Sequence, residues 1–181
     1  VKAGIYLLAR LSPVLGGTDL WFYALTTTGA STMVVGAYLT LRHTDLKLIL
    51  ACLTVSALGL LVLCLGLGTP DALFAAMVFL LAHALYKGAL FLVTGIVDHQ
   101  TGSRDVEQLG ALRSAMPITA TVAVLAGFSL AAFPPTLGFL GKEILLDAAL
   151  QGTAGAVTAA LVLASVIFVG TAGIVAVHPF F

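Results

Sequence analysis

The chain has 181 residues, of which 60% are hydrophobic and 9% are charged, and its mean hydropathy is +1.13. Soluble domains carry about 25% charged residues, so the composition excludes an ordinary soluble protein and indicates one that lies in a lipid bilayer. The formal net charge is zero, which excludes the basic surface that a nucleic-acid-binding protein presents.

The apolar segments are long and do not alternate as barrel strands do, which predicts an all-α, polytopic transmembrane helix bundle. No initiating Met, basic leader or cleavage site precedes the first segment, so we expect a fragment of a larger protein. About six membrane-crossing elements are expected, the first incomplete and the fifth broken: Val1–Leu11, Leu20–Leu41, 45–68, Ala72–Val97, Pro117–Leu150 and Ala154–Val177.

The second element combines aromatic and small residues. Trp21 and Tyr23 lie near one end, where aromatic side chains commonly anchor a helix at the membrane interface. The run from Thr26 to Thr32 consists of small residues, which favour close packing against a neighbouring helix. We therefore interpret its threonines as packing groups rather than ion ligands.

The fifth element is interrupted by Pro134, Pro135 and Gly138. It is too long for one straight span and short for two. Proline removes a backbone donor and breaks a helix. The sequence thus predicts either a discontinuous helix with a central break or two tightly joined segments.

Two polar segments set the expected orientation. Loop cations favour the cytoplasmic side of a membrane. The turn 42–47 holds Arg42 and Lys47, and the loop 98–115 holds Arg104 and Arg113, whereas the opposite loops hold only Arg10. We expect both segments on the cytoplasmic side.

The fourth element carries two ionisable residues at depth, His83 and Lys87. A lysine at the centre of a bilayer costs about 2.5–3.5 kcal/mol, and residues four apart share one helix face. A low dielectric favours the neutral form of a lysine, and histidine titrates near neutral pH, so the pair suits a proton relay. The alternative is that His83 donates to a backbone carbonyl while Lys87 snorkels or pairs with a distant carboxylate. However, Lys87 lies about 15 Å from the nearer end of its span, which is long for snorkelling.

Four further residues are candidates for the same chemistry. Lys142 follows the predicted break, where free carbonyls and water can solvate it, whereas Glu143 is adjacent in sequence and badly placed to pair with it. Lys47 begins a span, so it is either a cytoplasmic anchor or part of the path. Lys2 reaches membrane depth only if its helix extends well before Val1.

No nucleotide loop, metal cluster, haem motif or nucleophile arrangement is recognisable in the sequence. Cys52 and Cys64 lie within one apolar span and are interpreted as packing residues rather than a disulfide or metal site. We therefore expect no cofactor and no metal, and a transporter rather than an enzyme.

Several segments resemble the antiporter-like membrane subunits shared by respiratory complex I and the Mrp-type cation/proton antiporters. They are VKAGIYLLAR, TDLKLIL, LAHALYKGALFLVTGIVDHQTGSRD and GFLGKEILL, and GIVDHQTGSRD with VKAGIYLLAR looks most like the Mrp A-type branch. The resemblance implies two inverted five-helix repeats, each with a broken helix, and a central row of ionisable residues that conducts protons. It would place Lys2, Lys47, His83 and Lys87 on that path, and Lys142 at the broken helix as the terminal lysine.

The resemblance covers residues 1–150, which it assigns to a proton-translocating membrane domain. Residues 151–181, expected to form a final transmembrane helix and the C-terminal end, show little likeness. The first repeat of the family is missing.

The expected function is proton translocation within a multisubunit Na⁺/H⁺ antiporter of the bacterial cell membrane. The expected partners are other membrane subunits, the lipid bilayer, protons and Na⁺, with no nucleic acid. Two alternatives stay open: a proton-pumping membrane subunit of complex I, which neighbouring genes for quinone-reducing subunits would favour, and a non-functional truncated scaffold.

Overall fold

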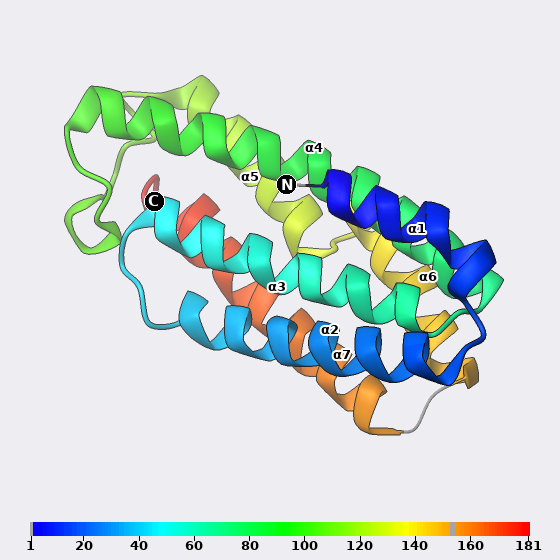
Figure 1. Ribbon diagram of the computed structural model, residues 1–181. Helices are drawn as coiled ribbons and strands as arrows, with labels where there is room; N and C mark the ends of the chain where they lie inside the picture. The colour runs from blue at the N-terminus through cyan, green and yellow to red at the C-terminus, as the bar shows by residue number, and fades with distance from the viewer. Residues whose placement is uncertain (1, 153–154) are drawn as a thin grey trace.

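The computed structural model describes residues 2–152 and 155–181; Val1 and Ala154, where two of the expected elements begin, lie outside the described residues. In this part of the chain seven α-helices form an elongated bundle (Figure 1). They are α1 (Ala3–Leu15), α2 (Asp19–Thr40), α3 (Leu46–Gly66), α4 (Pro70–Thr101), α5 (Pro117–Ala131), α6 (Leu137–Gly152) and α7 (Gly155–Ala172). A short turn η1 (Val106–Gln108) follows α4, and a π-helical turn η2 (Gly173–Val177) extends α7.

The all-α membrane bundle predicted from the sequence is confirmed. Among the described residues, three helical segments are long and apolar enough to cross a membrane: α3, α4 and the segment Thr158–Val177. The 32 residues of α4 span about 48 Å, which exceeds the ~30 Å hydrocarbon core. The helix extends past its predicted end at Val97 and reaches Thr101. It ends at Gly102, whose φ of 70° closes the helix in the left-handed conformation.

Helices α2 and α3 lie in close contact because small residues face one another. A Cβ atom at Gly59 would lie 2.7 Å from the carbonyl oxygen of Gly29 and 2.9 Å from the Cα of Met33. One turn away, the Ser56 hydroxyl donates to the Met33 carbonyl across the interface at 2.9 Å. The close packing predicted for the small-residue run of α2 is therefore confirmed, and it depends on the absence of side chains at these glycines.

Two predictions about helix ends were wrong. Trp21 is buried, and its indole donates to the Leu65 carbonyl at 3.1 Å, so it binds the end of α3 instead of anchoring α2 at an interface. Helix α1 continues past Leu11 and includes Pro13. Pro13 has a fixed, helix-compatible φ but no amide to donate to the Ala9 carbonyl, and the helix ends two residues later.

The predicted break in the fifth element is confirmed. Helix α5 ends at Ala131, where Ala132 adopts a left-handed φ of 59°, and α6 begins at Leu137. The two helices follow one another through the bundle as the halves of an interrupted element (Figure 1). The carbonyls of the last turn of α5 are thereby left without partners within the helix.

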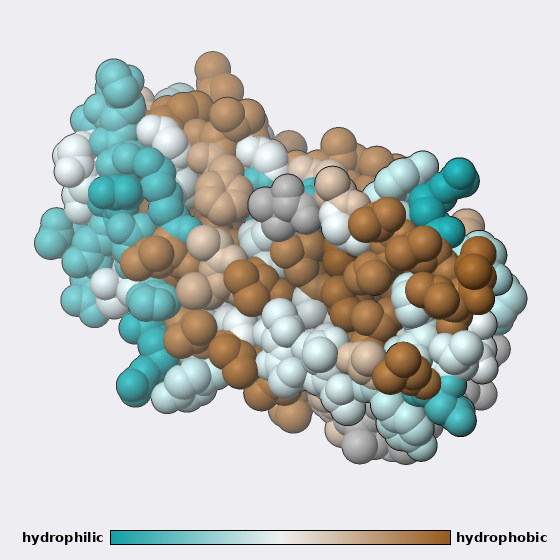
Figure 2. Space-filling view, viewed as in Figure 1, coloured by the Kyte–Doolittle hydropathy of each residue, from teal (hydrophilic) through white to brown (hydrophobic). Residues whose placement is uncertain are grey.

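The segments 42–47 and 98–115 lie at the same end of the bundle. The Leu46 amide donates to the Arg104 carbonyl at 2.9 Å, and the Val106 amide donates to the Thr44 carbonyl at 3.0 Å. Hydrophilic residues gather at this end, whereas the sides of the bundle expose mostly apolar residues (Figure 2). The loop 98–115 contains the three-residue turn η1.

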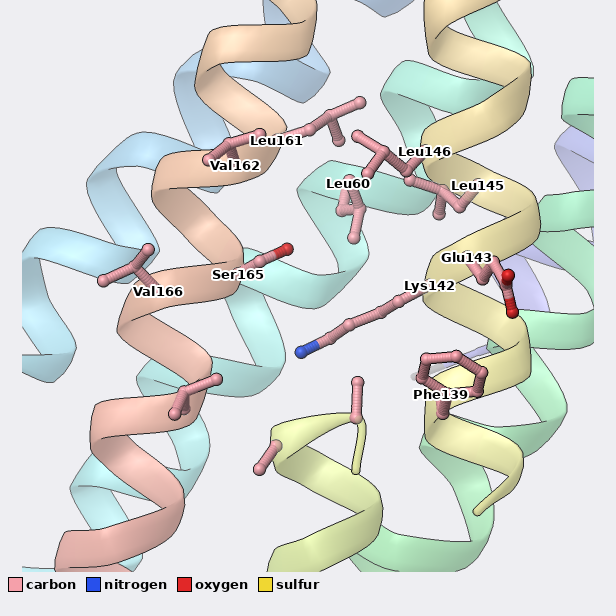
Figure 3. Close-up of a pocket in the computed structure, with 13 residues that line it drawn as sticks. Leu60, Phe139, Lys142, Glu143, Leu145, Leu146, Leu161, Val162, Ser165 and Val166 are labelled. Carbon is pink, nitrogen blue, oxygen red and sulfur yellow. The ribbon is translucent and has the colours of Figure 1, made fainter. Parts of the chain in front are cut away.

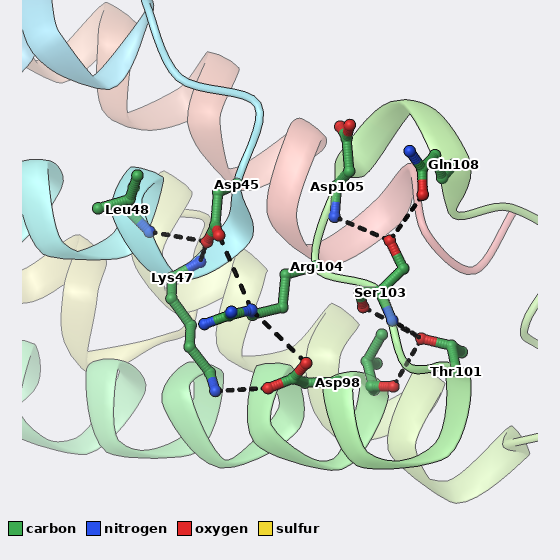
Figure 4. A network of polar contacts seen from close by, with 10 residues as sticks. Asp45, Lys47, Leu48, Asp98, Thr101, Ser103, Arg104, Asp105 and Gln108 are labelled. Carbon is green, nitrogen blue, oxygen red and sulfur yellow. Dashed lines mark hydrogen bonds and ion pairs between the residues drawn. The ribbon is translucent and has the colours of Figure 1, made fainter.

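Asp45 begins α3 as its N-cap, accepting hydrogen bonds from the amides of Lys47 at 2.8 Å and Leu48 at 3.2 Å (Figure 4). Replacing Asp45 with alanine is expected to lower the free energy of unfolding by about 1 kcal/mol, seen as a lower melting temperature of the detergent-solubilised full-length protein. Asp45→Asn is the matched control, because asparagine caps equally well but loses the charge that faces Arg104. If the two variants were equally destabilised, the ion pair rather than the cap would be responsible.

Candidate functional site

Lys87 lies in the interior of the bundle. Its side chain is 4% exposed, and its Nζ donates to the Leu50 carbonyl of α3 at 2.7 Å. The same carbonyl accepts a bond from the Thr54 hydroxyl at 2.8 Å. The ammonium group also lies 5.8 Å from the centre of the Phe91 ring. Lys87 thus neither snorkels nor pairs with a carboxylate of the described residues; a backbone carbonyl of the neighbouring helix holds it.

His83 lies one turn before Lys87 and is completely buried. Its ring is stacked on Phe79, with 6.1 Å between ring centres, and stands edge-on to Tyr86 at 5.4 Å. Neither ring nitrogen has a hydrogen-bond partner among the described residues. The alternative in which His83 donates to a backbone carbonyl is therefore not what the structure shows.

Lys142 extends from α6 into an apolar cavity between α6 and α7 (Figure 3). Its Nζ donates to the Leu130 carbonyl, in the last turn of α5, at 3.0 Å and lies 4.8 Å from the centre of the Phe168 ring. The prediction that a free carbonyl at the helix break would solvate this lysine is confirmed. The cavity measures about 430 Å³, and Ser165 contributes a hydroxyl to its otherwise mainly apolar wall.

Glu143 is exposed and points away from the Lys142 ammonium (Figure 3). The poor pairing expected of adjacent residues on a helix is confirmed. Within the described residues, neither Lys87 nor Lys142 forms a salt bridge.

Lys47 lies in a separate polar network at the hydrophilic end of the bundle (Figure 4). Its Nζ contacts the Asp98 carboxylate at 2.6 Å, and Arg104 lies 3.6 Å from the other Asp98 oxygen and 3.8 Å from Asp45. The structure thus does not bring Lys47 into contact with Lys87. The Asp98 carboxylate therefore links α4 to α3 through Lys47.

Lys2 is half-buried at the start of α1. Cys64 is buried in the core, as expected of a packing residue, and Cys52 is half-buried.

Which carbonyls contact the two lysines could not be predicted from the sequence. The Leu50 and Leu130 carbonyls carry no signal in a sequence, because every residue has one. Tyr86 could have been found, since it lies three residues after His83 and shares its helix face.

A family model, curated relatives and solved structures all match this chain. Residues 1–168 match the family model described as NADH:quinone oxidoreductase/Mrp antiporter, TM. The match continues past Gln151, beyond the motifs that carry the resemblance.

Two curated relatives are the A-type subunits of Na⁺/H⁺ antiporters. The one from Alkalihalophilus pseudofirmus is 45% identical over 84% of this chain and 21% of its own length, and the one from Bacillus subtilis is 42% identical over 84% and 20%. The chain therefore spans about a fifth of the length of these relatives.

Two solved structures are also similar. A chain of the Mrp complex from Dietzia sp. DQ12-45-1b superposes with a TM-score of 0.90 at 41% identity, over 97% of this chain and 20% of that one. A chain of the membrane-bound sulfane sulfur reductase, an archaeal respiratory membrane complex, superposes with a TM-score of 0.85 at 28% identity, over 94% and 30%. The family match, these relatives and the shared fold together show that the chain belongs to the NADH:quinone oxidoreductase/Mrp antiporter transmembrane family.

Proposed function

We propose that this chain is part of the large A-type subunit of a multisubunit Mrp-type Na⁺/H⁺ antiporter and that it carries protons through the membrane along lysines inside the bundle. The observation that supports this most directly is the environment of Lys87 and Lys142. Both are held by backbone carbonyls, at 2.7 Å and 3.0 Å, and neither has a carboxylate partner among the described residues. A carbonyl accepts a bond from a charged or a neutral amine, so such a lysine can release and regain a proton without losing its contact.

In the proposed mechanism, protons pass stepwise between Lys87, His83, Lys142 and bound water. Each lysine alternates between its charged and neutral forms, and charge on one disfavours charge on the next, which couples successive sites. Lys2, at the start of α1, is included among the groups that take part in this coupling.

Lys47 and Glu143 lie toward the ends of the path. Lys47 lies in the polar network at Asp98, apart from Lys87, on the side that we assign to the cytoplasm because of its excess of cations. Glu143 is exposed on α6, at the edge of the cavity that holds Lys142. The protein lies in a bacterial cell membrane with the other membrane subunits of the antiporter, as the names of the relatives and of the Dietzia complex support.

A second candidate is a membrane subunit of a redox-driven proton pump. The family description includes NADH:quinone oxidoreductase, and the archaeal respiratory complex contains a chain of the same fold. Neighbouring genes for quinone-reducing subunits would favour this candidate, and genes for small hydrophobic antiporter subunits would favour the first.

Replacing Lys142 with glutamine in the full-length protein tests the relay. Glutamine keeps a polar amide in the cavity but cannot carry a proton at neutral pH, so transport should fall by about 100-fold, a loss typical of removing a proton-transfer group. The measurement is cation-driven pH change in inverted membrane vesicles.

The matched control is Ser165→Ala, which changes a hydroxyl in the wall of the same cavity and should leave transport intact. Wild-type transport by Lys142→Gln in a fully assembled complex would refute the relay and would instead fit a structural scaffold, which tolerates neutral residues at Lys142 and Lys87.

A further inference from the structure

Three buried polar atoms in one part of α4 have no hydrogen-bond partner among the described residues. They are the Nδ1 and Nε2 atoms of His83 and the hydroxyl of Tyr86. Both residues are enclosed, with His83 completely buried and Tyr86 3% exposed. Buried polar groups in native proteins are almost always paired, because leaving one unpaired in an apolar interior is costly.

The two side chains share one place in the bundle. They lie three residues apart on α4, and their rings meet edge to face, with 5.4 Å between centres and an interplanar angle of 89°. Phe79 stacks on the imidazole, with 6.1 Å between ring centres. Because this chain already encloses all three atoms, a partner from outside could reach them only by displacing α4 or its neighbours.

The hydrogen-bonding groups of one internal water match those of the two side chains. A neutral imidazole needs one donor and one acceptor as partners, and a phenol hydroxyl can supply either. A buried water typically makes about three hydrogen bonds, enough to join His83 and Tyr86 and continue toward a third polar group. Lys87, one turn along the same face, is the nearest ionisable side chain of α4.

We infer that the Tyr86 hydroxyl holds an internal water against His83 and so fixes the imidazole orientation that proton exchange with Lys87 requires. Tyr86 is a positioning residue, since its phenol transfers no proton itself. The effect of Tyr86 on transport rests on the proposed function, whereas the presence of the bound water does not depend on that function.

The test uses the full-length protein in its assembled complex. A density map that resolves ordered water should show one within about 2.5–3.2 Å of the Tyr86 hydroxyl and a His83 nitrogen. A direct side-chain contact in its place, or a dry site, would overturn the inference whatever the transport assays give.

Transport gives the second readout. Tyr86→Phe should lower the rate to a value between the wild type and the ~100-fold loss expected on removing a proton-transfer group. The matched control is Tyr23→Phe, the same change at an exposed position of α2, which should leave the rate unchanged.

A double-mutant cycle separates positioning from general packing. If Tyr86 acts through His83, Tyr86→Phe should have no further effect in a His83→Ala background, whereas independent packing effects would add. Additivity, or a wild-type rate for Tyr86→Phe while Lys87→Ala is inactive, would overturn the role of Tyr86 and leave the proton path standing. Full activity of Lys87→Ala would instead contradict the path itself.

Discussion

Replacing Lys87 with alanine in the full-length protein is expected to reduce proton-coupled cation transport by at least about 100-fold, the lower end of what a proton-transfer group contributes. Lys87 is the most deeply buried cation of the described chain, and its ammonium contacts the Leu50 carbonyl at 2.7 Å. Alanine leaves no group there that can bind a proton. The measurement is cation-driven pH change in inverted vesicles that contain the whole complex.

Lys87→Arg separates positive charge from proton exchange. Arginine keeps the charge and can still donate to a carbonyl, but it does not release its proton in proteins. We therefore expect this variant to assemble and to be as inactive as Lys87→Ala. Transport at the wild-type rate by Lys87→Arg would show that only the charge is needed, and the relay would be wrong.

Replacing Gly59 with alanine is expected to destabilise the bundle strongly. The new methyl group would meet the backbone of α2, with the Gly29 oxygen at 2.7 Å and the Met33 Cα at 2.9 Å. Two backbones cannot adjust as a flexible side chain can, so the helices must separate, at a cost of about 1–3 kcal/mol as for other overpacked cores. The measurement is the melting temperature of the detergent-solubilised protein.

Gly95→Ala on α4 is the matched control. Nothing lies within 4 Å of the position where its Cβ would be, and alanine favours a helix more than glycine does. We expect its melting temperature to be equal to or slightly above that of the wild type. A Gly59→Ala protein as stable as this control would mean that the α2–α3 contact is looser than the structure indicates.

Much of the fold could be predicted because membrane helices are encoded locally. Long apolar runs, the prolines at 134 and 135 and the loop cations sufficed to predict the helices, the broken element and the common side of the segments 42–47 and 98–115. Lys87 and Lys142 stood out for the same local reason, since a charge in an apolar run is costly and rare. Trp21 was misassigned because the same side chain suits a membrane interface or a buried contact, and only the position of Leu65 decides which.

The amino-acid order by itself determined that the chain forms membrane helices, where they break, and which of them carry buried cations. These properties depend on the transfer of each segment from water to lipid, which is a sum over neighbouring residues. Only the tertiary structure decided what those cations touch: the carbonyls of Leu50 and Leu130 for two lysines, and the Asp98 carboxylate for Lys47. Lys87 and Leu50 are 37 residues apart in the chain. They meet because α3 and α4 pack side by side, and no local pattern specifies which backbone groups that packing presents.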